Sequence, residues 1–207
     1  MSLLHAVTTA LVPPLCATCG RTCRPDAILC TRCSRRLAEA DPLEGAGPAG
    51  IDRAWSSAPH ESVPRDLVTA LKFRRLLAAA DLIADRIEWL APATVLSGTI
   101  VPVPTAPLRT ALRGFDPAAE IATALAQRTQ LPLQTCLSRR GGGRQVGKRR
   151  AQRIGHPPLI QTRGKVPTSV LLVDDVLTTG STLSACARAL RSAGSVRVAA
   201  ITFSRRL

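Results

Sequence analysis

The segment Val170–Thr182, VLLVDDVLTTGST, constrains the fold of this chain more than its composition does. Its apolar residues predict a strand over 169–175 that is buried on both faces, as in a parallel sheet covered by helices. Two carboxylates follow, then a loop of hydroxyl residues and a glycine. The pattern after the loop predicts a helix over 181–194, closed by Gly194. A strand, a loop and a helix in this order indicate an α/β fold.

The rest of the chain alternates between strand and helix patterns, which predicts a mostly parallel sheet flanked by helices. Apolar residues recur at three- and four-residue spacing over 64–90, so we expect one or two helices there. Asp116 can cap, and Pro117 can start, a helix over 116–129. Residues 139–165 are basic and glycine-rich, which favours a mobile loop. The other predicted strands are 53–59, 99–104, 131–137 and 195–203.

A length of 207 residues allows one α/β domain and a small appendage. Residues 41–50, DPLEGAGPAG, are Gly/Pro-rich and predict a linker. We therefore expect an N-terminal segment with a cysteine module (1–40), this linker, and a main domain (51–207). No apolar run approaches the ~20 residues of a membrane-spanning helix. The N-terminus lacks the basic start of a secretory signal, so we predict a cytoplasmic protein.

Five of the seven cysteines lie close together near the N-terminus. Two C-x2-C pairs can bring four thiolates to one tetrahedral ion, and with no export signal zinc is favoured over disulfides. Four sulfur ligands would close the site, so its predicted role is structural. The predicted ligands are Cys16, Cys19, Cys30 and Cys33, with Cys23 as a possible substitute.

The loop after the 169–175 strand has the composition of an anion site. Its residues lie where a helix begins, and there free backbone N–H groups and the helix dipole favour phosphate. Asp174 and Asp175 end the strand and can accept hydrogen bonds from a sugar diol. The GxxxxGK[ST] pattern is absent, which disfavours nucleoside triphosphate hydrolysis. The predicted phosphate-binding residues are Thr178, Thr179, Gly180, Ser181 and Thr182.

Positive charge is concentrated in the second part of the chain. The net charge is +14, and residues 121–207 carry 15 basic residues but only two acidic ones, Asp174 and Asp175. This imbalance favours an anionic partner, either nucleic acid or a phosphorylated small molecule. With three Phe, two Trp and no Tyr, a base-stacking platform for single strands has little support. Lys72 fits a solvated helix face and a place in the site about equally well.

Taken in order, these motifs resemble those of the ComF family of competence proteins, which includes the ComFC-like and GntX-like groups. VLLVDDVLTTGST resembles the phosphoribosyl diphosphate (PRPP) signature of type I phosphoribosyltransferases. The paired CxxC motifs, LKFR at 71–74, VPVPTAPLRTALRGFDPAAEIA at 101–122, and Gln145 with Arg153 complete the resemblance. It implies a type I phosphoribosyltransferase-like domain behind a small zinc module.

The resemblance also implies roles for individual residues. Asp174 and Asp175 would hold the ribose hydroxyls of PRPP, and the loop 178–182 its 5′-phosphate. Mg²⁺ would be held mainly by pyrophosphate and ribose oxygens. Residues 139–153 would correspond to the mobile loop that covers the site. The candidates for pyrophosphate and loop contacts are Arg109, Arg113, Gly114, Gln145 and Arg153.

Two functions follow from the resemblance. The first is a PRPP-binding protein of the phosphoribosyltransferase type that supports DNA uptake, with turnover and the acceptor base left open. The second is a non-catalytic accessory protein that binds single-stranded DNA through its basic half, with DNA-uptake proteins as partners. In that case the PRPP site would remain only as a ligand sensor or relic. Retained PRPP binding fits both functions, so the site residues do not separate them.

Overall fold

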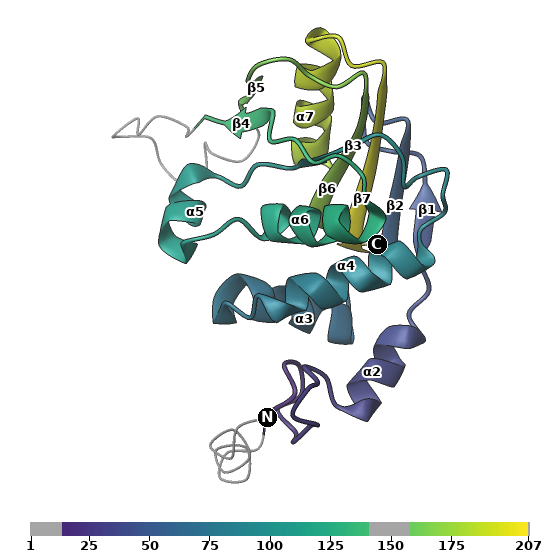
Figure 1. Ribbon diagram of the computed structural model, residues 1–207, viewed down its shortest axis with the longest axis vertical. Helices are drawn as coiled ribbons and strands as arrows, with labels where there is room; N and C mark the ends of the chain where they lie inside the picture. Colours follow the sequence, from purple (N-terminus) through teal and green to yellow (C-terminus); the bar gives the residue numbers. More distant parts are fainter. Residues whose placement is uncertain (1–13, 141–157, 207) are drawn as a thin grey trace.

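A five-stranded sheet lies at the centre of the molecule, in the strand order β1-β2-β7-β6-β3 (Figure 1). The structure is a computed structural model and describes residues 14–140 and 158–206. β1 pairs antiparallel with β2, and the other neighbours pair in parallel, which confirms the predicted fold class. The strands are β1 Leu43–Gly45, β2 Arg53–Pro59, β3 Thr99–Pro102, β6 Ser169–Leu177 and β7 Arg197–Arg205.

Helices cover both faces of the sheet. Alternate residues of a strand point to opposite faces, so Leu171 and Val173 pack with α3, α4 and α6 while Leu172 packs with α7. The predicted helical region 64–90 forms two helices, because Arg75 takes a left-handed conformation and ends the first. The helices are α2 Thr31–Ala38, α3 Ser62–Arg74, α4 Ala78–Leu90, α5 Pro107–Arg113, α6 Pro117–Thr129 and α7 Ser181–Ser192.

Two predictions about the middle of the chain need correction. Residues 131–137 do not form one regular strand, because Leu133 makes an isolated parallel bridge to Ile100 of β3 and Leu137 already begins β4. Pro132 has no N–H to donate, which limits the pairing of this edge segment. The segment 139–165 is not a loop throughout, because β5 (Ile160–Thr162) pairs with β4 (Leu137–Arg139) in an antiparallel hairpin. Residues 141–157 lie outside the described part.

The predicted linker contributes to the sheet. Within residues 41–50, β1 adds an antiparallel edge strand, in which Leu43 lies opposite Ser56 of β2. The next residues cross to the start of α7, where Pro48 packs against Gly180. The division into 1–40, 41–50 and 51–207 stays a prediction. Within the described ranges, no helix is both long and apolar enough to cross a bilayer.

Candidate functional site

The strand order places a topological switch point between β3 and β6. The chain leaves β3 through α6 on one face of the sheet and leaves β6 through α7 on the opposite face. Ligands of open α/β sheets bind beside such a point, at the carboxyl ends of the strands. The segments that follow these two strands are therefore the walls of the candidate site.

Residues 178–182, which we call the anion loop, form a small hollow with Asp174 at the end of β6. Asp174, Thr178, Gly180, Ser181 and Thr182 line this hollow, together with Val176, Leu177 and Leu183. α7 begins at Ser181, and the first N–H groups of a helix have no partner within the helix. The structure thus brings a carboxylate, hydroxyl groups and a helix N-terminus together, as a sugar phosphate requires.

Thr179 has a different position from the other loop residues. Its Oγ1 donates a hydrogen bond to Ser181 Oγ at 3.2 Å and accepts one from the Ser181 backbone N–H at 3.4 Å. Thr179 does not line the hollow. Its hydroxyl therefore holds the turn that leads into α7.

The two adjacent aspartates have separate surroundings. Asp174 lines the hollow on the α7 side, whereas the Asp175 carboxylate forms an ion pair with Lys72 of α3 on the opposite face. The Lys72 Nζ–Asp175 Oδ2 distance is 2.6 Å, and the side chains are only 21% and 9% exposed. Strand alternation requires this separation. Of the two open interpretations of Lys72, the structure therefore excludes a solvated helix face.

Asp174 is held in a site that disfavours its charge. Burial, and then the negative charge of neighbouring Asp175, raise the pKa of the Asp174 carboxyl well above its ordinary value. The Asp175 backbone N–H donates to Asp174 Oδ1 at 2.8 Å and offsets only part of this effect. A buried carboxyl group with a raised pKa, in a hollow lined by hydroxyl groups and a helix N-terminus, is poised to receive a polar ligand.

Asp116 shapes the other wall of the site. As predicted, it caps α6, accepting from the Ala118 N–H at 3.1 Å. It also accepts from the backbone N–H and the hydroxyl of Thr105, both at 2.9 Å. One carboxylate therefore fixes both ends of the segment 105–116, which carries α5. The sequence pattern predicted the cap but not the contact with Thr105.

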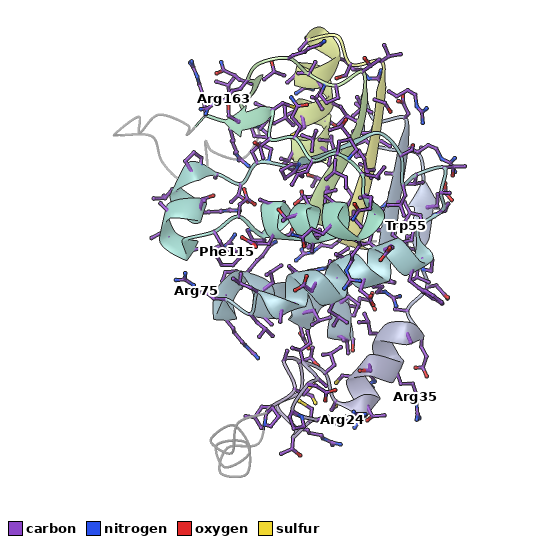
Figure 2. The ribbon with its side chains drawn as sticks, viewed as in Figure 1. Arg24, Arg35, Trp55, Arg75, Phe115 and Arg163 are labelled. Atoms are coloured by element: carbon purple, nitrogen blue, oxygen red, sulfur yellow. The ribbon has the colours of Figure 1, made fainter. Side chains whose placement is uncertain are left out.

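The segment 105–116 contains three of the residues predicted to contact pyrophosphate, but they do not line the hollow. Arg109 and Gly114 are exposed. The Arg113 guanidinium lies over the ring of Phe73, 5.2 Å from its centroid. Gly114 has φ +80°, and Arg75 at the end of α3 packs against it; Figure 2 shows Arg75 beside the neighbouring Phe115. Gln145 and Arg153 lie outside the described residues.

Gly180 is the tightest point of the anion loop, and replacing it with Ala should destabilise the protein. Its φ is +72°, and a Cβ there would lie 2.4 Å from Pro48 Cγ. We expect a loss of about 2–4 kcal/mol in the unfolding free energy, from left-handed strain and overpacking together. Urea unfolding measures this loss.

Gly164→Ala is the matched control for Gly180→Ala. Gly164 has φ +66°, but no atom lies within 4 Å of a Cβ built there, so this change adds strain without a clash. It should cost about 1–2 kcal/mol. Equal losses for the two variants would show that the contact with Pro48 does not constrain the loop.

Four cysteine sulfurs converge near the N-terminus, as the sequence predicted. The Sγ atoms of Cys16, Cys19, Cys30 and Cys33 all lie within 4.8 Å of one another. The Cys19–Cys30 Sγ distance of 3.7 Å matches the edge of about 3.8 Å that Zn–S bonds of about 2.3 Å give a tetrahedron. Figure 2 shows the sulfur atoms together beside Arg24. The four residues therefore fit a zinc ion.

Position and hydrogen bonding, not the direction of the pKa shift, separate Cys23 from the four predicted ligands, because burial raises the pKa of Cys33, one of the four, to about 12. Burial raises the pKa of Cys16, but hydrogen bonds, first from the Cys19 backbone, outweigh it and lower the pKa to about 5. The Cys33 backbone lowers the pKa of Cys30. Cys23 instead donates to the Ala27 and Pro14 carbonyl oxygens at 3.1 and 3.4 Å, and burial raises its pKa. The structure therefore places Cys23 outside the cluster.

A family model matches the second part of this chain. Residues 111–207 match the family model of the phosphoribosyl transferase domain. This range contains the anion loop, Asp174 and the second part of the segment that follows β3, from Ala111 onward. No curated protein matches the chain in a sequence search.

The solved structures to which this chain is similar include several phosphoribosyltransferases. Orotate phosphoribosyltransferase from Aeropyrum pernix is 20% identical over 83% of this chain and 78% of its own, with a TM-score of 0.39. An allosteric regulatory enzyme of purine biosynthesis is 19% identical over 59% of this chain, with a TM-score of 0.40. The glutamine PRPP amidotransferase of B. subtilis is 21% identical over the same share, with a TM-score of 0.38. The match covers 24% of each of the last two chains.

Proposed function

We propose that this protein binds PRPP and belongs to the phosphoribosyltransferase-like proteins of the ComF type. The observation that carries the proposal is the hollow at the switch point, where Asp174 and the anion loop meet the N-terminus of α7. In this proposal, Asp174 accepts hydrogen bonds from the ribose hydroxyls. Thr178, Gly180, Ser181 and Thr182 surround the 5′-phosphate, and Asp175 supports Asp174 from the other face through Lys72.

The segment after β3 would face the pyrophosphate. Arg109 and Arg113 carry positive charge on α5, whose position Asp116 fixes. Cleavage at the anomeric carbon would leave an oxocarbenium-like sugar and a departing pyrophosphate, and cationic groups would stabilise that leaving group. Pyrophosphate and ribose oxygens bind Mg²⁺ readily, and its charge would neutralise the leaving group further. Bound PRPP would then contact both the anion loop and the segment after β3.

Calorimetric titration of the zinc-loaded chain with PRPP and Mg²⁺ tests the binding function. We expect one PRPP per chain, and ribose 5-phosphate should compete for the same site. Incubation with PRPP and a panel of nucleobases, with pyrophosphate release as the readout, then separates an enzyme from a PRPP sensor. A chain that binds neither PRPP nor ribose 5-phosphate would contradict the proposal.

A second candidate function, binding of single-stranded DNA in support of DNA uptake, rests on the charge of residues 121–207. The only two acids of this half are Asp174, which lines the hollow, and Asp175, which is paired with Lys72. Arg140 and Arg163 are exposed next to the β4–β5 hairpin, where Figure 2 labels Arg163. An anionic backbone could approach this side without meeting acidic groups from the same half.

Salt dependence tests the DNA function. Each phosphate contact contributes about −0.7 to the slope of log K against log salt for single strands. Changing Arg149, Arg150 and Arg153, which lie outside the described residues, to Ala should flatten the slope by about 2. The effect should be similar for all sequences, because phosphate contacts carry no base information. An unchanged slope would show that these three arginines do not contact the DNA backbone.

A further inference from the structure

Helix α3 contacts both the cysteine cluster and the candidate site. Arg74 Nη1 donates to the carbonyl oxygen of Ala17, which lies between Cys16 and Cys19, at 2.9 Å. Two residues earlier, Lys72 Nζ lies 2.6 Å from Asp175 Oδ2. Residues two apart on a helix point to nearly opposite sides. The two cations therefore hold one helix between the first CxxC turn and the end of β6.

The cysteine module and α3 contribute side chains to one apolar cluster, which packs the module against the main domain. Cys16, Leu29 and Cys33 are buried in one cluster with Leu67 and Leu71 of α3. Figure 1 shows the module and α2 beyond α3, at the end of the molecule away from α7. Because the interior is close-packed, a change in the shape of the module must displace α3 or leave a void beside it.

A second arginine fixes the module from the neighbouring helix. Arg86 of α4 is buried, and its Nη2 donates both to the Ala40 carbonyl oxygen, just after α2, and to the Ser57 carbonyl oxygen of β2 at 3.0 Å. The end of α2 is therefore anchored to the sheet independently of α3. Loss of order in the CxxC turns would then act mainly on the contact that Arg74 makes.

At the site, α3 acts through the buried ion pair. Asp175 is paired with Lys72, and its backbone N–H donates to Asp174 Oδ1 at 2.8 Å. A displacement of α3 would withdraw Lys72 and leave a buried carboxylate without its cation, next to the carboxyl group that lines the hollow. The position of one ammonium group therefore affects the charge and the geometry at Asp174.

We propose that α3 couples metal occupancy of the four-cysteine cluster to the affinity of the anion loop, with Lys72 as the positioning residue. The proposal rests on the proposed function for the nature of the ligand. Coupling between two sites is reciprocal. If zinc raises the affinity for a sugar phosphate by some factor, the sugar phosphate must raise the affinity for zinc by the same factor.

The test uses the full chain, with ribose 5-phosphate as the probe. We expect calorimetry to give a dissociation constant about 10-fold lower for the zinc-loaded chain than for the chelator-stripped chain, within the usual range of such couplings. In the reciprocal measurement, competition with a chromogenic chelator should show zinc held about 10-fold more tightly when ribose 5-phosphate is saturating. This second measurement needs no stable metal-free protein.

Two variants test the route. Arg74→Ala leaves all four thiols in place, so it should still bind one zinc, but zinc and ribose 5-phosphate should no longer affect each other. Lys72→Met should weaken ribose 5-phosphate binding to the zinc-loaded chain and also remove the dependence on zinc. Arg65→Ala is the matched control, because Arg65 lies on the same helix and forms an exposed pair with Asp66. It should keep the full coupling.

The outcomes separate this inference from the function on which it rests. Failure of the zinc-loaded chain to bind ribose 5-phosphate would overturn the proposed function, and the coupling with it. Binding that is independent of zinc, together with zinc affinity unchanged by ribose 5-phosphate, would overturn the coupling alone. Full coupling in Arg74→Ala and Lys72→Met would show that α3 is not the route.

Discussion

Asp174→Asn is expected to abolish PRPP binding and, at the same time, to make the unliganded protein more stable. The carboxylate is the acceptor that the hollow offers to a sugar diol, and an amide NH2 would present donors in its place. Burial and the charge of Asp175 already disfavour the ionised form of Asp174. The uncharged isostere therefore removes an electrostatic cost that the Asp175 N–H and the charge of Lys72 offset only in part. Calorimetry with PRPP and thermal unfolding without it measure the two effects.

The pH dependence of stability gives the direction in which Asp174→Asn should change Tm. The pKa of Asp174 is raised on folding, so its contribution to stability is fully present below its ordinary value of 3.8. That contribution is lost as the pH rises through the folded-state pKa. At neutral pH, Asp174→Asn should therefore raise Tm, by ~2–4 °C for each kcal/mol gained in a chain of this size. A lower Tm for Asp174→Asn would contradict this interpretation of the site.

Asp175→Asn provides the matched comparison because it should have the opposite effect on stability. This change leaves the largely buried Lys72 without its counter-charge, at a cost of about 3 kcal/mol. Two adjacent and chemically identical substitutions should thus shift Tm in opposite directions. Asp81→Asn, an exposed position at the start of α4, should change neither Tm nor PRPP affinity appreciably.

Removal of the metal is expected to unfold the N-terminal module. The purified chain should contain about one zinc, and Ser in place of Cys16, Cys19, Cys30 or Cys33 should lose it. A module of this size cannot build a core of its own, so metal binding supplies much of its folding free energy. Because the module shares its core with α3, Tm should fall by at least ~10 °C. Metal analysis and thermal unfolding measure both effects.

Cys23→Ser is the matched control for the metal site. The Cys23 thiol donates to two backbone carbonyl groups, and a serine hydroxyl can replace such bonds. This variant should keep its zinc and most of its stability. Loss of zinc from Cys23→Ser would mean that the ligand set is different from the one the four converging sulfurs indicate.

Local patterns predicted the parts of the fold that depend on short-range order. The apolar run of β6, the Asp116-Pro117 start of α6 and the spacing of the CxxC pairs carry their signals within a few residues. β1 was missed because a three-residue strand in a Gly/Pro-rich segment depends on its pairing with β2. Lys72 could not be assigned because Asp175, its partner, lies far along the chain. The separation of Asp174 from Asp175 was predictable, because strand alternation requires it.

The packing of Pro48 against Gly180 also bears on how this protein can change over evolution. A segment that joins two parts is usually free to vary in length, but residues 41–50 pair with β2 and cover the anion loop. An insertion or deletion there would shift Pro48 and reshape the loop, even though every residue of the loop itself were kept. A gene fusion that exchanged the cysteine module for another at this boundary would therefore have to rebuild the ligand site as well.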